Sequence, residues 1–219
     1  IASGSARKRH IRFSPDGKYL VYESQEKTNG PKVLILHSLT DGSTNQLSDP
    51  DNNELLAEFS AAFSRNGKSL IFFRYATKKC QLIVLDLQHK IEQSMGKCPD
   101  AATSSIDWSP DGNTLVTNLF DRENKIESLL LIDTKSKKRR VLVTPNFSSS
   151  GYLFPRYSPS GDKIAVVYLR PIDNQWTVGV IDVSNGEFSA VFKSEQKINQ
   201  VVWGETDNNL FYVVDSDFD

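Results

Sequence analysis

The sequence is poor in the features that mark membrane, metal and nucleotide-binding proteins. It has two cysteines, three histidines and one methionine, and no apolar run approaches the roughly 20 residues that span a bilayer. The motifs GxSxG, HExxH and GxxxxGK(S/T) are absent, and no segment keeps a helical period over 11 or more residues. We therefore expect neither a transmembrane helix nor a helical domain within this chain.

Excess charge of one sign is also missing. The 219 residues include 26 basic and 27 acidic side chains, so the net charge of −1 gives no global attraction to nucleic acid or to anionic lipid. The first ten residues, IASGSARKRH, lack the apolar core of a signal peptide. Because residue 1 is Ile and the single methionine is Met95, the sequence predicts a fragment or a processed form.

One ten-residue pattern recurs along the chain. Each copy has an aromatic residue, a polar turn and an apolar run, and an aliphatic residue always stands seven places after the aromatic one. The copies are FSPDGKYLVY (13–22), FSRNGKSLIF (63–72), WSPDGNTLVT (108–117), YSPSGDKIAV (157–166) and a degenerate WGETDNNLFY (203–212). Five copies in one register predict a repeat architecture.

A second motif follows each of the first four copies. These apolar runs are VLILHSL (33–39), LIVLDL (82–87), LLLID (129–133) and VGVIDV (178–183). Each is followed by a tight turn and a weaker strand pattern. A unit therefore reads as strand A, turn, strand B, loop, strand C, turn and strand D.

Four antiparallel strands that recur every 45 to 50 residues are typical of a β-propeller. The near-continuous apolar runs of strands B and C fit sheets that are covered on both faces by neighbouring blades. We predict an all-β chain of four-stranded antiparallel blades, with four full repeats and partial ones. A β-sandwich is the alternative, but a sandwich needs no fixed repeat.

The Ser-Pro-Asp-Gly segment itself predicts a type I turn closed by a left-handed glycine. The acidic residue varies between copies, from Asp16 to Asn66 and Ser160, and Asp207 stands where the fifth copy needs the glycine. A catalytic carboxylate would make one copy special, so we interpret the motif as a turn. The aspartates that end strand C, which are Asp86, Asp133 and Asp182, are likewise interpreted as turn caps.

The pattern resembles the TolB-like repeat, also called PD40 or WD40-like, over nearly the whole chain. The resemblance implies a single propeller domain over 1–219, with repeats that begin near 11, 59, 104, 153 and 199. It also implies a six-bladed, longer parent. The spacing of Ile1 and Ala2 from Phe13 indicates that they end strand D of a preceding blade, and a mixed blade formed by both ends of the chain is the alternative.

Cys80 and Cys98 are placed symmetrically about residue 89, the centre of the second C–D turn. Residues symmetric about a hairpin centre face each other within reach of a disulfide. We predict a Cys80–Cys98 bridge, and hence an oxidising, extracytoplasmic compartment such as the periplasm; two unrelated thiols are the alternative.

No cofactor or metal is predicted, because His10, His37 and His89 have no ligand neighbour at useful spacing. The basic clusters at 7–10 and 135–140 are interpreted as protection of strand edges, with an anionic partner as the alternative. Groove-reading elements are absent, so we expect no direct nucleic-acid binding.

The D–A and B–C loops are long and share one side of a blade by strand parity. This long-loop face is predicted to bind a protein partner or a small signal ligand. The residues proposed for it are Arg74, Tyr75, Phe120, Arg122, Phe147, Tyr152, Arg170 and Trp176. Packing of these side chains over the blade ends is the alternative.

Three functional hypotheses follow from the resemblance. The first is the non-enzymatic sensory propeller of a membrane-anchored, winged-helix regulator of the CadC/ToxR-like type. The second is a TolB-type periplasmic protein-binding propeller. The third is the propeller domain of a prolyl-oligopeptidase-type serine peptidase, whose catalytic domain would be a separate α/β-hydrolase.

Overall fold

A computed structural model describes residues 7–27, 29–48, 54–77, 79–100, 105–146, 150–170, 172 and 174–215. The chain divides into two compact units, residues 1–98 and residues 99–219, and each is described by itself. The prediction of a single domain over 1–219 therefore stays a prediction.

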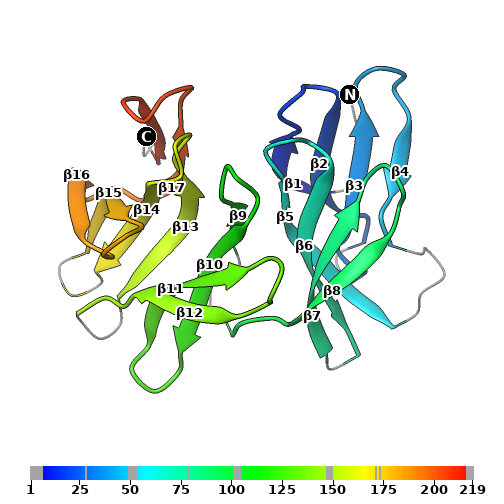
Figure 1. The fold of residues 1–219 in the computed structure, drawn as a ribbon. Helices are drawn as coiled ribbons and strands as arrows, with labels where there is room; N and C mark the ends of the chain where they lie inside the picture. Colours follow the sequence, from blue (N-terminus) through cyan, green and yellow to red (C-terminus); the bar gives the residue numbers. More distant parts are fainter. Residues whose placement is uncertain are drawn as a thin grey trace. The chain divides into compact units, whose positions relative to one another are not determined.

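Unit 1 consists of two four-stranded antiparallel meanders (Figure 1). The first holds β1 (Arg7–Phe13), β2 (Tyr19–Gln25), β3 (Val33–Ser38) and β4 (Thr44–Gln46). The second holds β5 (Leu55–Phe63), β6 (Ser69–Ala76), β7 (Lys79–Asp86) and β8 (Glu92–Lys97). In both sheets the strands lie side by side in chain order.

Unit 2 holds two further four-stranded antiparallel meanders, which a parallel pairing of Glu127 with Gly151 joins into one eight-stranded sheet, and a separate two-stranded sheet. Its third blade holds β9 (Ile106–Trp108), β10 (Thr114–Asp121), β11 (Ile126–Asp133) and β12 (Arg139–Val143). Its fourth holds β13 (Gly151–Tyr157), β14 (Lys163–Arg170), β15 (Gln175–Asp182) and β16 (Phe188–Ser194), and β17 (Ile198–Trp203) pairs with β18 (Leu210–Val214). The predicted fold class, four-stranded antiparallel propeller blades, is confirmed.

The strand B segments are buried on both faces. In β6 the consecutive residues Leu70, Ile71 and Phe72 are each 0% exposed, which an alternating strand with one wet face would not allow. Leu70 and Phe72 belong to a cluster that includes Val21 and Leu34 of the first blade. Blade-to-blade burial therefore explains why the apolar runs in the sequence do not alternate.

The predicted disulfide joins Cys80 of β7 to Cys98, which directly follows β8, with their Cα atoms 5.2 Å apart. Ile83 pairs with Ser94, and a register shift near Gly96, whose φ is +96°, then aligns Gln81 with Lys97. Without that shift the two cysteines would be one residue out of register. The symmetric spacing of the two cysteines brings them opposite each other because of this β-bulge, and Cys80 lies inside strand C.

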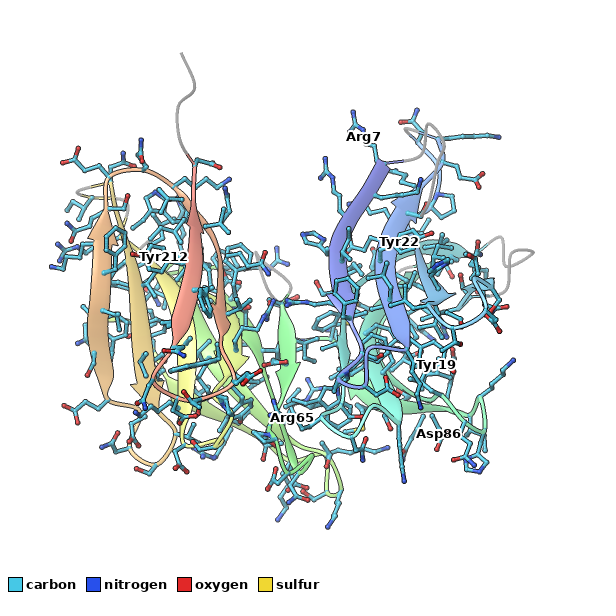
Figure 2. The ribbon with its side chains drawn as sticks, turned by 90° about the horizontal axis from the view of Figure 1, so that it is seen from above. Arg7, Tyr19, Tyr22, Arg65, Asp86 and Tyr212 are labelled. Atoms are coloured by element: carbon cyan, nitrogen blue, oxygen red, sulfur yellow. A yellow bond between two sulfur atoms is a disulfide. The ribbon has the colours of Figure 1, made fainter. Side chains whose placement is uncertain are left out.

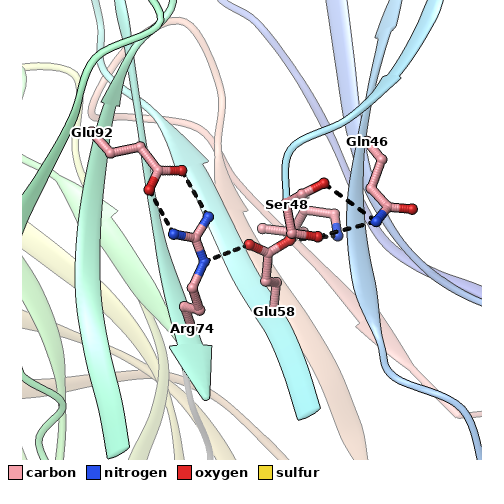
Figure 3. A network of polar contacts seen from close by, with 6 residues as sticks. Gln46, Ser48, Glu58, Arg74 and Glu92 are labelled. Carbon is pink, nitrogen blue, oxygen red and sulfur yellow. Dashed lines mark hydrogen bonds and ion pairs between the residues drawn. The ribbon is translucent and has the colours of Figure 1, made fainter. Parts of the chain in front are cut away.

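An ion cluster of buried Glu58, half-buried Arg74 and exposed Glu92 crosses the second blade (Figure 3). Arg74 donates from Nε to Glu58 over 2.8 Å and makes two further hydrogen bonds, of 2.5 and 2.7 Å, to Glu92. The Glu58 side chain is completely buried and also accepts the backbone N–H of Leu34 from the first blade. The cluster therefore links strands A, B and D of the second blade and also contacts the first blade.

Burial alone would lower the pKa of Arg74. The hydrogen bonds and charges of Glu92 and Glu58 outweigh that effect and hold the pKa of Arg74 above its ordinary value. Arg74 therefore keeps its positive charge beside the two carboxylates at neutral pH.

Removal of the disulfide tests its contribution. We expect the double variant Cys80→Ala/Cys98→Ala to lose about 3 kcal/mol of unfolding free energy, because the bridge closes a loop across a sequence separation of 18. Urea unfolding of oxidised, reduced and variant protein measures the loss. Superposition of the variant curve on the oxidised curve, or two free thiols in the denatured, non-reduced chain, would contradict the assignment.

Loss of Arg74 should be far more costly than loss of an exposed arginine. Arg74→Met leaves Glu58 buried without its cation, and breaking a buried pair in this way costs about 3–5 kcal/mol. The matched control is Arg122→Met, whose side chain is 78% exposed and lies 3.6 Å from Asp100, so about 0–1 kcal/mol is expected. Equal unfolding free energies for the two variants would show that the ion cluster stabilises the fold no more than the exposed ion pair of Arg122 does.

Candidate functional site

The repeated polar segment forms a hairpin turn in the first four copies. Gly17 donates its N–H to the Ser14 carbonyl over 2.9 Å, and its φ of +68° is in the left-handed region that favours glycine. Ser14 Oγ accepts the N–H of Tyr19 and donates to Asp16, which in turn accepts the N–H of Lys18. Asp16 is thus a turn residue, and the turn interpretation is confirmed.

The second copy makes the same contacts without a carboxylate. Asn66 accepts from Ser64 Oγ and from the Lys68 N–H, at 2.8 and 3.0 Å. Only the acceptor oxygen is therefore needed, which explains why the sequence tolerates either residue type at this position.

The fifth copy departs from the prediction. Asp207 was expected to replace the glycine in the left-handed conformation, but its φ is not positive. Its carboxylate instead accepts hydrogen bonds from the backbone and side chain of Ser160, in the turn of the preceding blade. Because Asp207 makes this contact between turns, the degenerate copy still anchors the two-stranded sheet to its neighbour.

The aspartates at the ends of strand C cap the following turns, as predicted. Asp86 accepts the backbone N–H groups of Gln88 and His89, and Asp133 and Asp182 accept equivalent groups two and three residues on. These hydrogen bonds stabilise the ionised form, so the pKa of each of the three carboxyl groups is lowered. Figure 2 labels Asp86 at its turn.

The histidines have partners of several kinds. His10 Nδ1 lies 2.9 Å from the Glu23 carboxylate, His37 Nδ1 lies 2.9 Å from Thr44 Oγ1, and His89 Nδ1 lies 3.2 Å from Asp86. Among the described residues, no group of three or more histidine, cysteine or acidic side chains could hold a metal ion.

The residues proposed for the long-loop face differ in how accessible they are. In unit 1, Arg74 and Tyr75 lie in β6 and not in a loop; Arg74 is held in the ion cluster, whereas Tyr75 is 39% exposed. Tyr75 is therefore the accessible member of the pair.

In unit 2, Arg122 is the most exposed member of the predicted set, with an ion pair to Asp100. Phe120 and Arg170 end their strands half-buried, and Trp176 packs against the apolar cluster of the fourth blade. Tyr152 is only 6% exposed, and its ring contacts Tyr168 and Phe188, so burial raises the pKa of Tyr152 to about 12. Its side chain is not on the surface, and Phe147 lies outside the described residues.

Two features escaped the sequence analysis. Strand A of three blades holds a non-glycine residue with positive φ three places before the aromatic residue, namely His10, Ser60 and Phe154. The N–H of Ser60 is bound by Glu23 of the preceding blade. The position three places before each aromatic residue could be found in the sequence. The three residues there are of different types, however, so nothing in the sequence indicated the unusual backbone.

The second feature that was not predicted from the sequence is a recess of about 460 Å³ in unit 2, between the fourth blade and the β17–β18 sheet. Its apolar lining comes from Val180, Val191, Trp203 and Leu210, and charged residues form its rim. It lies at the turn ends of the strands, away from the loops that the sequence analysis favoured. Recesses of this size are large enough for a small ligand or a few side chains.

In the part of the chain that the structure describes, no helix is long and apolar enough to cross a membrane.

Comparison with solved structures identifies propellers of the TolB type. TolB from Acinetobacter baumannii has a TM-score of 0.68 at 20% identity, covering 86% of this chain and 44% of that one. A TolB-type protein from Agrobacterium tumefaciens also has a TM-score of 0.68, at 19% identity, with 88% and 68% covered. The chain thus spans less than half the length of the first of these relatives.

Peptidases are similar as well. A prolyl endopeptidase structure has a TM-score of 0.63 at 14% identity and covers 86% of this chain and 30% of that one. At these identities the similarity shows a shared fold. A comparison with curated proteins found no match.

The sequence itself matches a family profile over most of its length. The match covers residues 6–160 and describes the N-terminal region of dipeptidyl peptidase IV. This region carries the first three turn motifs and most of the fourth. The chain belongs to the dipeptidyl peptidase IV N-terminal region family and has a TolB-like β-propeller fold.

Proposed function

We propose that this chain is a non-enzymatic recognition propeller that binds a protein partner outside the cytoplasm. The observation that carries the proposal is that the repeated aspartates are engaged in hydrogen bonds within turns. The aspartates of the turn motif and of strand C accept backbone or hydroxyl hydrogen bonds within their own turns, as Asp111 does from Ser109 and Asn113. Carboxylates committed to turns are poor candidates for acid or base chemistry.

The Cys80–Cys98 bridge supports an oxidising compartment, because structural disulfides persist mainly in secreted and periplasmic proteins. The similarity to TolB favours the same setting. The finer proposal is the sensory domain of a membrane-anchored winged-helix regulator of the CadC-like type. In this case, a winged helix and one apolar helix of about 20 residues precede the propeller in the parent protein.

A propeller domain of a prolyl-oligopeptidase-type peptidase is the second candidate. It is favoured by the family match and by the structural similarity to a prolyl endopeptidase and to an acylaminoacyl peptidase. The parent sequence separates the two. An α/β-hydrolase with serine, aspartate and histidine after the propeller would establish the peptidase.

The long-loop face remains the proposed partner surface. Only those of its residues that are accessible to solvent are proposed to contact the partner. Arg122 is the exposed residue proposed in unit 2, Tyr75 is the exposed residue proposed in unit 1, and each is tested by itself. Tyrosine and arginine are both enriched among the residues that dominate binding energy at interfaces.

Site-specific photo-crosslinking tests this face. A photoreactive residue in place of Arg122 or Tyr75, introduced into the full-length parent in its native cells, should give discrete adducts with one partner. The matched control is the same residue in place of Lys137, in an exposed C–D turn. Equal adducts from all three positions, or no adducts from Arg122 and Tyr75, would exclude the long-loop face as the partner surface.

Acid should weaken the fold through the turn carboxylates. The backbone N–H of Ser43 lowers the pKa of Asp41 to about 2, and the hydrogen bond from Ser14 is the main reason that the pKa of Asp16 is lowered. Groups with a depressed folded-state pKa stabilise the fold above their unfolded value, near 3.8, and this contribution is lost as the pH falls through the folded-state value. The urea midpoint should therefore drop between about pH 4 and about pH 2.

Asp16→Asn is the matched control for this prediction, because Asn66 already makes the same contacts in the second blade. The variant should keep its fold and its partner crosslinks near neutral pH, and its stability should fall less steeply in acid. Loss of partner binding with an intact fold would instead identify Asp16 as a functional carboxylate.

A further inference from the structure

A small recess of about 130 Å³ lies at the long-loop side of the first blade. Three exposed cationic side chains line it, namely Arg7 and Arg9 of β1 and Lys32, which directly precedes β3. The carboxylate of buried Glu23 lines it as well. Within the described parts of the chain, no ion pair engages any of the three cations. Figure 2 labels Arg7 at the start of β1.

The recess lies on the face of the first blade that contacts the second blade. Glu23 accepts the backbone N–H of Ser60 over 2.9 Å, and the Lys32 carbonyl accepts the N–H of Glu58 over 2.7 Å. Both donors belong to β5, strand A of the second blade. The position of the recess is therefore fixed by contacts between two adjacent blades of unit 1.

The backbone near Lys32 is held from a second direction too. The side-chain amide of Gln25, at the end of β2, donates a hydrogen bond to the Gly30 carbonyl over 2.9 Å. Because this loop is already tied to both blades, little ordering of its backbone is needed when a ligand binds, and that favours affinity.

In other blades, the position of Arg9 and Glu23 is apolar. These two residues face each other between β1 and β2, just before the bulge in strand A. The equivalent pairs are Phe59 with Phe73 in the second blade, whose rings stack at 5.4 Å, and buried Leu153 with Val167 in the fourth. An apolar pair is thus sufficient for the fold at this position, so the needs of the fold do not explain the charged residues of the first blade.

The charges that line the recess favour a doubly charged anion. Three cations and one carboxylate leave a net charge of +2, and a phosphate group carries about −1.5 to −2 at neutral pH. A guanidinium group presents paired N–H donors that match the oxygens of a phosphate. Sites that enclose a drug-sized ligand have volumes of roughly 300–1,000 Å³, so this smaller recess fits one anionic group and not a whole cofactor.

We propose that Arg7, Arg9 and Lys32 bind a phosphate group in this recess. The group is either free inorganic phosphate or the phosphate of a larger ligand whose remainder extends into solvent. Neither Tyr75 nor Arg122, the residues proposed to contact a protein partner, belongs to the recess. The phosphate site and the partner surface can therefore fail independently.

Titration calorimetry on the 219-residue chain, in a phosphate-free buffer of fixed ionic strength, tests the proposal. Inorganic phosphate should bind saturably at one site, and acetate should bind at least about tenfold more weakly because it carries a single charge. Glycerol 3-phosphate is the probe for a phosphate ester. Tighter binding of the ester supports a phosphate-bearing ligand, and tighter binding of inorganic phosphate supports the free ion.

Charge-neutralising variants locate the site. Arg9→Gln and Lys32→Gln should each weaken phosphate binding by at least about tenfold, since each loses a charge-assisted hydrogen bond. The matched controls are Arg65→Gln and Lys18→Gln, which make the same charge changes in the exposed A–B turns of the second and first blades. Both controls should bind phosphate as the unchanged chain does. Thermal unfolding establishes that all four variants are folded.

Amide chemical shifts provide a readout that does not depend on a variant. Addition of phosphate should shift the amide signals of 7–9, 23–25 and 30–32, and should leave those of the basic cluster at 135–140 unchanged. Equal shifts at both places would show an adventitious ion only. Absence of saturable binding, acetate binding as tight as that of phosphate, or equal losses in the variants and their controls would also overturn the proposal.

Discussion

Burial of both faces of each sheet is the constraint on which the structure depends. A four-stranded meander with apolar residues on both sides cannot be stable alone, because one face would stay in water. In the described chain, fully buried Phe72 of β6, Val116 of β10 and Val166 of β14 each belong to an apolar cluster that includes residues of an adjacent blade. The polar turns, the bulges and the ion cluster then set how neighbouring blades align.

The fold was predictable because the repeat encodes both the period and the turn chemistry. An aromatic residue and an aliphatic residue seven places later pair across the A–B hairpin, as Phe13 pairs with Leu20 and Tyr157 with Ile164. That spacing is imposed by the turn, so it is local and readable without a structure. The same holds for Asp86 and its equivalents, whose partners are two and three residues away.

The side-chain partners of the residues assigned to the long-loop face were not readable. Arg74 was assigned to a partner surface because arginine beside tyrosine is typical of interfaces, whereas its charge is neutralised by Glu58 and Glu92, 16 and 18 residues away. Tyr152 was assigned in the same way and is buried in an aromatic cluster. Residue type indicates what a side chain can do, but burial decides what it does, and burial here depends on which blade lies against it.

The repeat also indicates where function should be sought. Features shared by all blades serve the fold, since a contact needed once cannot be required at five equivalent positions. The departures are therefore the informative places: the exposed loop around Arg122, and the turn in which Asp207 stands at the glycine position and binds Ser160 of the preceding blade. A chain built of repeats thus separates the contacts that every blade needs from the contacts that one blade makes alone.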